Sequence, residues 1–314
     1  MRHIQWPENK KFAFTIFDDT DFSTIQNTKP VYDLLQKLNI KTTKSCWVYN
    51  PDPNTKALNN GSSLENKDYR EWLLEMQTNG FEIALHNVSS GSSKRDKIIS
   101  GINDFKEIFK YDNIIFANHA GTRDSIYWAS SRLSGVSKLL YKLLTRNKKD
   151  NSFVGHVLTS EYYWADYLQK HVKYIRNFTF REINTLKACP QMPYRNSKTP
   201  MANYWFASCD GGTLSSFCQA LTKDKIDRLI DEQGCCIMYT HFGAGFVDSN
   251  GKIDKNFSEI MEYIASKNGW FSPVSEVLNY LQDLRDADYY ITRQEHDSLS
   301  RKWLFEKVIN GGTS

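Results

Sequence analysis

The stretch Phe14-Thr15-Ile16-Phe17-Asp18-Asp19-Thr20 is an apolar run that ends in two adjacent carboxylates. Neighbouring residues at the end of a strand point in different directions. The two aspartates can therefore serve two purposes around one site, such as accepting a proton and binding a metal. Aspartates also often cap the loop that follows a strand, and this structural role remains an alternative for both.

Three later apolar runs also end in side chains that can bind a metal or transfer a proton. They lead to His86, to Asn118 and His119, and to His241. The carboxyl ends of parallel strands gather on one rim, where the active sites of such folds lie, so we expect these side chains to meet. Each histidine alone could be a hydrogen-bonded structural residue, but their joint placement at strand ends favours a metal site.

Strand-like and helix-like segments alternate along the chain, which is typical of βα units around parallel strands. A helix that begins after Asn66 and runs to residue 78, for example, directly precedes the strand that leads to His86. Another helix is expected to start at residues 27–30, with Pro30 in its first turn. The 314 residues, 40% of them apolar, suffice for one barrel-sized domain or two smaller ones, and we favour one.

The strand-end motifs resemble those of the polysaccharide deacetylases, whose catalytic module is the NodB homology domain. The first motif of that family, Thr-Phe-Asp-Asp, is similar to Thr15-Ile16-Phe17-Asp18-Asp19 with one inserted residue. Its last motif, an apolar strand ending in Leu-x-His, is similar to Met238-Tyr239-Thr240-His241. The resemblance implies an α/β fold, a distorted (β/α) barrel. We place it at residues 1–287, with a helical insertion at about 130–151 and a C-terminal appendage over 288–314.

The resemblance also implies roles for the residues at these strand ends. Asp18 would be the general base, Asp19 a metal ligand and His241 the general acid. An arginine keeps the base ionised in the family, and Arg176 or Arg123 could do so here. A surface salt bridge is an equal alternative for either arginine.

One metal ligand of the family is missing from its usual place in this sequence. The second motif of the family has two histidines four residues apart, whereas His86 is followed at that spacing by Ser90. We infer that His119 replaces the missing ligand, with His156 in reserve. A set of Asp19, His86 and His119 suits a divalent metal, above all zinc, and tolerates cobalt, nickel or iron.

Aromatic residues make up 14% of the chain, and flat aromatic faces can stack on sugar rings, although most such rings pack in a core. Asp210 could bind a sugar hydroxyl, orient His241, or belong to a plain turn. The residues that we expect to contact substrate are Asn118, Tyr127, Trp128, Asp210 and Tyr239.

These observations lead to a hypothesis of function. We expect a metal-dependent hydrolase that removes an acetyl group from an N-acylated sugar, a precursor of a surface polysaccharide such as the O-antigen of lipopolysaccharide. One alternative is another metal-dependent hydrolase that cleaves a small cyclic amide, urea-like compound or formamide. A second is a non-catalytic carbohydrate-binding relative whose site decayed when the histidine at position 90 was lost.

The net charge bears on nucleic-acid binding, and the hydropathy of the chain bears on its cellular location. The balance of 40 basic and 36 acidic residues gives a net charge of +4, so no nucleic-acid partner is indicated. Residues 1–11 contain no apolar core of a signal peptide, and no run of about 18 apolar residues could span a bilayer. We therefore expect a cytoplasmic protein. Its six cysteines, without CxxC spacing, are expected to be reduced thiols.

Residues 132–149 form a predicted basic amphipathic helix, in which leucines recur at helical spacing among lysines and arginines. Such a helix can lie on an anionic membrane, here the inner face of the cytoplasmic membrane. The alternative is a helix that packs its leucines on the barrel and exposes a solvated basic face.

Overall fold

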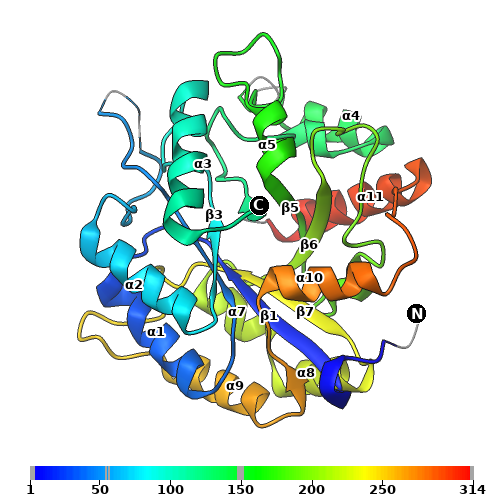
Figure 1. Cartoon of the computed structure of the whole chain (residues 1–314). Helices are drawn as coiled ribbons and strands as arrows, with labels where there is room; N and C mark the ends of the chain where they lie inside the picture. Colours follow the sequence, from blue (N-terminus) through cyan, green and yellow to red (C-terminus); the bar gives the residue numbers. More distant parts are fainter. Residues whose placement is uncertain (1–3, 54, 56, 147–151, 312–314) are drawn as a thin grey trace.

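The computed structural model describes residues 4–53, 55, 57–146 and 152–311, and its centre is a closed barrel of parallel strands (Figure 1). Within these residues, β1 to β7 pair in sequence order, β7 pairs with β1, and β1 also pairs with β2, which closes the ring. The strands are β1 (Phe12–Asp18), β2 (Thr43–Cys46), β3 (Glu82–Leu85), β4 (Ile114–Ala117), β5 (Val172–Phe180), β6 (Tyr204–Asp210), β7 (Cys235–Thr240) and β8 (Gly269–Trp270). The predicted distorted (β/α) barrel is confirmed.

Strand β1 is the seam of the barrel, and every one of its residues is buried. It pairs with β7 along its length, whereas its first residues pair with β8 and its last two with β2. A near-continuous apolar run suits a parallel strand that is covered on both faces. Because Asp18 is in register with Lys44 of β2, the closing pair of strands brings a carboxylate beside an amine.

Helices surround the barrel and connect the strands. They are η1 (Pro7–Asn9), α1 (Ile25–Lys37), α2 (Lys67–Thr78), α3 (Arg95–Phe109), η2 (Ala129–Arg132), α4 (Gly135–Leu144), α5 (Ala165–His171), α6 (Thr185–Ala188), α7 (Leu214–Ala220), α8 (Lys223–Asp231), α9 (Lys255–Ala265), α10 (Val274–Asp283) and α11 (Arg293–Asn310). None of the helices in the described part of the chain has both the length and the apolar character that a membrane span requires.

The N-termini of α1 and α2 can be compared with the helix starts that the sequence predicted. Asn66 caps α2 as predicted, because its side chain accepts a hydrogen bond from the backbone of Tyr69. The predicted start of α1 at residues 27–30 is wrong. Thr24 and Asn27 form a reciprocal capping box there, so the helix begins at Ile25 and Pro30 lies inside it.

The predicted helix 132–149 is shorter in the structure. Residues 129–132 form η2 and residues 135–144 form α4, while Lys148 and Lys149 lie outside the described residues. Helix α11, from the expected C-terminal appendage, packs against α4 and β5. The domain limits at 287 and 288 stay a prediction.

Candidate metal and catalytic site

A cavity of about 170 Å³ opens at the carboxyl end of the barrel strands. Its lining comes from the turns after β1, β3, β4 and β7, from β5, and from the loop after β2. The lining residues are Asp19, Asp21, Phe22, Asn59, His86, Asn118, His119, Ala120, Trp128, Arg176, Tyr239 and His241. The strand-end histidines that the sequence singled out therefore do meet at one rim.

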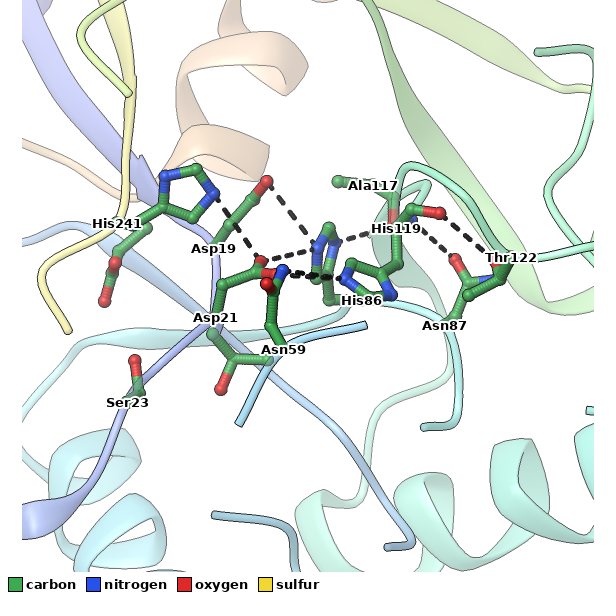
Figure 2. A network of polar contacts seen from close by, with 12 residues as sticks. Asp19, Asp21, Ser23, Asn59, His86, Asn87, Ala117, His119, Thr122 and His241 are labelled. Atoms are coloured by element: carbon green, nitrogen blue, oxygen red, sulfur yellow. Dashed lines mark hydrogen bonds and ion pairs between the residues drawn. The ribbon is translucent and has the colours of Figure 1, made fainter. Parts of the chain in front are cut away.

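Asp21, His86 and His119 form a buried group whose possible ligand atoms lie within 4.8 Å of one another (Figure 2). His86 Nδ1 lies 3.1 Å from the carbonyl oxygen of Ala117. A carbonyl only accepts, so Nδ1 carries a proton and Nε2 is the ring nitrogen that faces the cavity. That atom lies 3.2 Å from Asp21 Oδ2, and two electron-rich atoms at this distance require a proton or a metal ion between them. The group therefore fits a divalent metal.

His119 enters the same group from the end of β4. Its Nε2 lies 2.9 Å from Asp21 Oδ1, and its backbone N–H donates to Asn87 Oδ1 at 2.8 Å. The ring packs edge-on against Trp47 and His86. Among the described residues, His119 Nδ1 has no hydrogen-bond partner. The ring is therefore held in place by its packing and by the backbone hydrogen bond, and not by a hydrogen bond to Nδ1.

The carboxylate of Asp21 is buried but remains ionised. Burial raises its pKa, yet hydrogen bonds and charge from His119 and His86 outweigh that effect and hold the pKa well below the ordinary range. A carboxylate that stays deprotonated among imidazoles is the donor set that divalent metals select.

Asp19 is bound by the guanidinium of Arg176, which extends from β5. The guanidinium donates to both carboxylate oxygens, with Nη1 at 2.8 Å from Oδ1, and both side chains are 3% exposed. Burial raises the pKa of Asp19, but the charge and hydrogen bonds of Arg176, together with charge from His86 and His241, outweigh burial and leave the pKa below the ordinary value. His86 Nε2 lies 3.7 Å from Asp19 Oδ2, so this ionised carboxylate borders the metal group.

His241 reaches the cavity from the end of β7, across Asp21 from His119 (Figure 2). Its Nδ1 lies 2.7 Å from the carbonyl oxygen of Gly212 and so carries a proton, which leaves Nε2 facing the cavity. Nε2 lies 3.5 Å from Asp21 Oδ2 and 3.2 Å from the hydroxyl of Tyr239. The site thus has a carboxylate, Asp19, and an imidazole, His241, beside one group of possible ligands.

Comparison with solved structures identifies the architecture. A structure described as a polysaccharide deacetylase from Mycobacterium smegmatis matches with a TM-score of 0.50 at 11% identity, over 93% of this chain and 97% of that one. The chain has the fold of the polysaccharide deacetylases. The structure of Puue allantoinase matches with a TM-score of 0.52 at 11% identity, over 91% and 95% of the two chains. No family model and no curated protein matches the sequence.

Within this deacetylase fold the structure corrects the placement of Asp18. Asp18 does not line the cavity; it is fully buried and faces Lys44, whose Nζ lies 3.2 Å away. Tyr32 and the backbone N–H of Phe242 also donate to it, at 3.0 and 2.8 Å. The carboxylate that the sequence assigned as the general base therefore stabilises the barrel seam, and Asp19 occupies the position that borders the cavity.

Asp19 as a metal ligand stays a prediction. Asp19 belongs to a second possible group with Asp21 and His241, but Arg176 engages both of its oxygens. Asp21, two residues further along, is the carboxylate that contacts both His86 and His119. The sequence contained a signal for it, since the motif continues as Asp18-Asp19-Thr20-Asp21.

The expected substrate residues divide into two groups. Asn118, Trp128 and Tyr239 line the cavity. Asn118 uses its amide to hold the following loop, because it exchanges two hydrogen bonds with the backbone of Ile126. Trp128 and Tyr239 therefore offer aromatic surfaces at this site, as does Phe22, which the sequence did not single out.

Three other predicted residues lie outside the cavity lining. Arg123 is exposed over the ring of Tyr162, so Arg176 alone holds an aspartate of the site. Tyr127 packs against His156, at 4.5 Å between ring centres. Asp210 accepts a hydrogen bond from the backbone N–H of Gly212 at 3.2 Å, and the carbonyl oxygen of Gly212 lies 2.7 Å from His241 Nδ1.

The reserve ligand His156 is not part of either possible metal group of the described residues. Burial, with a contribution from Lys138, lowers its pKa to about 4, which leaves it neutral at physiological pH. Its Nδ1 accepts a hydrogen bond from the backbone of Tyr127 at 3.2 Å. His156 therefore supports the loop behind the cavity.

Asn59 was not expected at the site. Its amide nitrogen donates to Asp21 and lies 3.5 Å from His119 Nε2. It belongs to the polar loop after β2, and that loop is tied to the turn after β1 by backbone hydrogen bonds between Phe22 and Asn60 and between Ser62 and Ser23. No local sequence pattern marks such a long-range attachment.

Proposed function

We propose that the protein is a metal-dependent hydrolase that cleaves the C–N bond of an acylated amine, and that its substrate is an N-acetylated sugar. One observation carries the proposal. A ligand group of Asp21, His86 and His119 shares one cavity with an arginine-bound carboxylate, Asp19, and an imidazole, His241. The deacetylase fold is consistent with this use of the cavity.

The residues divide the chemistry among them. Asp21, His86 and His119 would hold the ion, for which zinc is our first choice and which would acidify a water molecule and polarise the amide carbonyl when bound. Asp19, kept ionised by Arg176, accepts the proton of the attacking water. His241 borders the group and donates a proton to the departing amine from Nε2, while Gly212 fixes its ring through Nδ1.

The size of the cavity limits what it admits. A volume of about 170 Å³ suits an acyl group and part of one sugar ring, so the rest of a larger substrate would extend past Trp128 at the wall. This favours an acetylated sugar within a larger precursor, such as a nucleotide-linked or lipid-linked intermediate of a surface polysaccharide or O-antigen. We place that substrate in the cytoplasm.

A second candidate function is cleavage of a C–N bond in a small molecule such as a cyclic amide or urea-like compound. The match to an allantoinase structure favours it, because that protein shares the fold at a comparable TM-score. A panel of N-acetylated sugars, sugar nucleotides, cyclic amides and ureides separates the two functions. Acetate release from the sugars alone supports deacetylation.

The first test is metal content by elemental analysis of protein purified without added metal. We expect a near-stoichiometric divalent ion in the wild type, loss of it in His86→Ala, and retention in the control His156→Ala. Metal-free wild type that binds carbohydrate without hydrolysis would contradict the proposal and favour a non-catalytic relative. Full metal content in His86→Ala would remove that residue from the ligand set.

A further inference from the structure

Helix α4 exposes its leucines and buries its polar residues, the reverse of an ordinary surface helix. Five aliphatic side chains on it are between 46% and 69% exposed: Val136, Leu139, Leu140, Leu143 and Leu144. The only residues of α4 that are buried are Ser137 and Tyr141. The expectation that these leucines pack on the barrel is therefore not met, and the helix presents an apolar face to its surroundings.

The buried side of α4 is firmly attached. Tyr141 packs on Trp303 of α11, and the hydroxyl of Ser134, the N-cap residue, lies 3.3 Å from that of Ser300. Arg132, just before α4, lies between the rings of Trp303 and Trp128, about 4 Å from each ring centre. Because Trp128 also lines the cavity, the exposed face belongs to the same packed unit as the wall of the site.

Helix α11 lies beside α4 and also exposes apolar side chains (Figure 1). Its last turns expose Phe305, Val308 and Ile309, which recur at the three- and four-residue spacing of one helix face. Isolated exposed leucines are normal on proteins, but a concentration of this kind marks a surface that binds something apolar.

The charge around α4 identifies the partner. Residues 125–149 contain no acidic residue and six basic ones. Lys138 and Lys142 of α4 are half-buried and Arg146 is exposed, and all three alternate in sequence with the exposed leucines. Leucines flanked by lysines and arginines match a bilayer surface, in which acyl chains lie beneath anionic headgroups.

A second copy of the chain is a weaker candidate for this face. A two-fold interface brings the same patch of both copies together, so the basic residues of one would meet the basic residues of the other. No carboxylate within residues 125–149 could offset that repulsion. Anionic lipid supplies the complementary charge.

We propose that α4 is a membrane-docking helix that lies in the headgroup region of an anionic bilayer with Leu139, Leu140 and Leu143 inserted. Docking does not depend on the metal or on the hydrolysis proposed above. It would hold the wall of the cavity near the lipid surface through the Trp303, Arg132 and Trp128 stack.

The test is co-sedimentation of the full chain with phosphatidylcholine vesicles, with and without phosphatidylglycerol. We expect binding to the anionic vesicles that weakens with added salt. Leu139→Gln with Leu143→Gln should lower the partition coefficient by about tenfold or more. Lys138→Gln with Arg146→Gln should lower binding to anionic vesicles and leave the residual binding to neutral vesicles unchanged.

The matched control is Leu284→Gln, which changes an exposed leucine at the end of α10 and should bind as the wild type does. Melting temperatures should be equal for all variants, because each altered side chain is largely outside the core. Absence of wild-type binding to anionic vesicles would overturn the proposal. So would equal binding by the leucine variants, or a wild-type dimer that Leu143→Gln converts to a monomer.

Discussion

Asp18 and Asp19 are adjacent, equally buried and each paired with a buried cation, yet they face different parts of the molecule. Lys44, Tyr32 and the backbone of Phe242 surround Asp18 inside the barrel seam. Asp19 accepts two hydrogen bonds from Arg176 and also lines the cavity. The two residues differ in that Asp18 is enclosed by its partners, whereas the carboxylate of Asp19 still reaches the cavity and can contact a bound molecule there.

The first prediction concerns activity and separates the two aspartates most widely. Asp19→Asn should lower kcat/KM by about 10²–10⁴-fold, because an amide cannot accept the proton of the attacking water. Metal content should stay at the wild-type level, as measured by elemental analysis.

The matched variant for Asp18 removes its partner as well, so that no buried charge is left alone. Asp18→Asn with Lys44→Met should keep kcat/KM within a few-fold of the wild type. A loss as large as that of Asp19→Asn would restore Asp18 as the base that the sequence motif suggested.

The second prediction concerns stability and addresses the seam. Lys44→Met leaves Asp18 buried without its cation, which should lower the free energy of unfolding by about 3–5 kcal/mol. Denaturant titration measures the change. Lys44→Met combined with Asp18→Leu should recover most of the loss. If the single variant is as stable as the wild type, the pair does not hold the seam.

The third prediction concerns the ligand group next to the two pairs. Asp21→Asn removes the carboxylate that contacts both histidines and should weaken metal affinity by at least about 100-fold. Competition with a fluorescent chelator measures it. Asp19→Asn is the control, since its carboxylate is occupied by Arg176, and equal weakening in the two variants would place Asp19 among the ligands.

The fourth prediction is the smallest and uses pH. Arg176 depresses the pKa of Asp19, so the wild-type carboxylate remains ionised as pH falls to the ordinary range of aspartate and below it. Arg176→Gln removes that effect, and the acid limb of the pH profile of kcat/KM should move to higher pH by at least about one unit. An unchanged acid limb would show that Asp19 is not the group that must be ionised.

The sequence predicted the barrel and three of the histidines at the site, because apolar runs that end in polar residues report strand ends directly. His86, His119 and His241 all reach the cavity. It did not predict which aspartate faces the cavity, since that depends on where β1 stops. Asp18 still pairs with Thr240 and Lys44, so it belongs to the strand, and the turn that follows delivers Asp19 and Asp21.

Residues brought in by long-range contacts gave no signal in the sequence. Asn59 reaches Asp21 because its loop is fastened to the turn after β1, across almost forty positions of chain. The orientation of α4 was left open between two alternatives, because helical spacing of leucines is the same whether they point inward or outward. Burial of Ser137 and Tyr141 decided that orientation.

The amide of Asn59 lies over the carboxylate of Asp21 and close to Nε2 of His119. An ion bound by Asp21 and His119 would compete with this amide for Asp21 Oδ1. We therefore expect the rate at which a bound ion dissociates to depend on the Asn59 hydrogen bond as well as on the ligands.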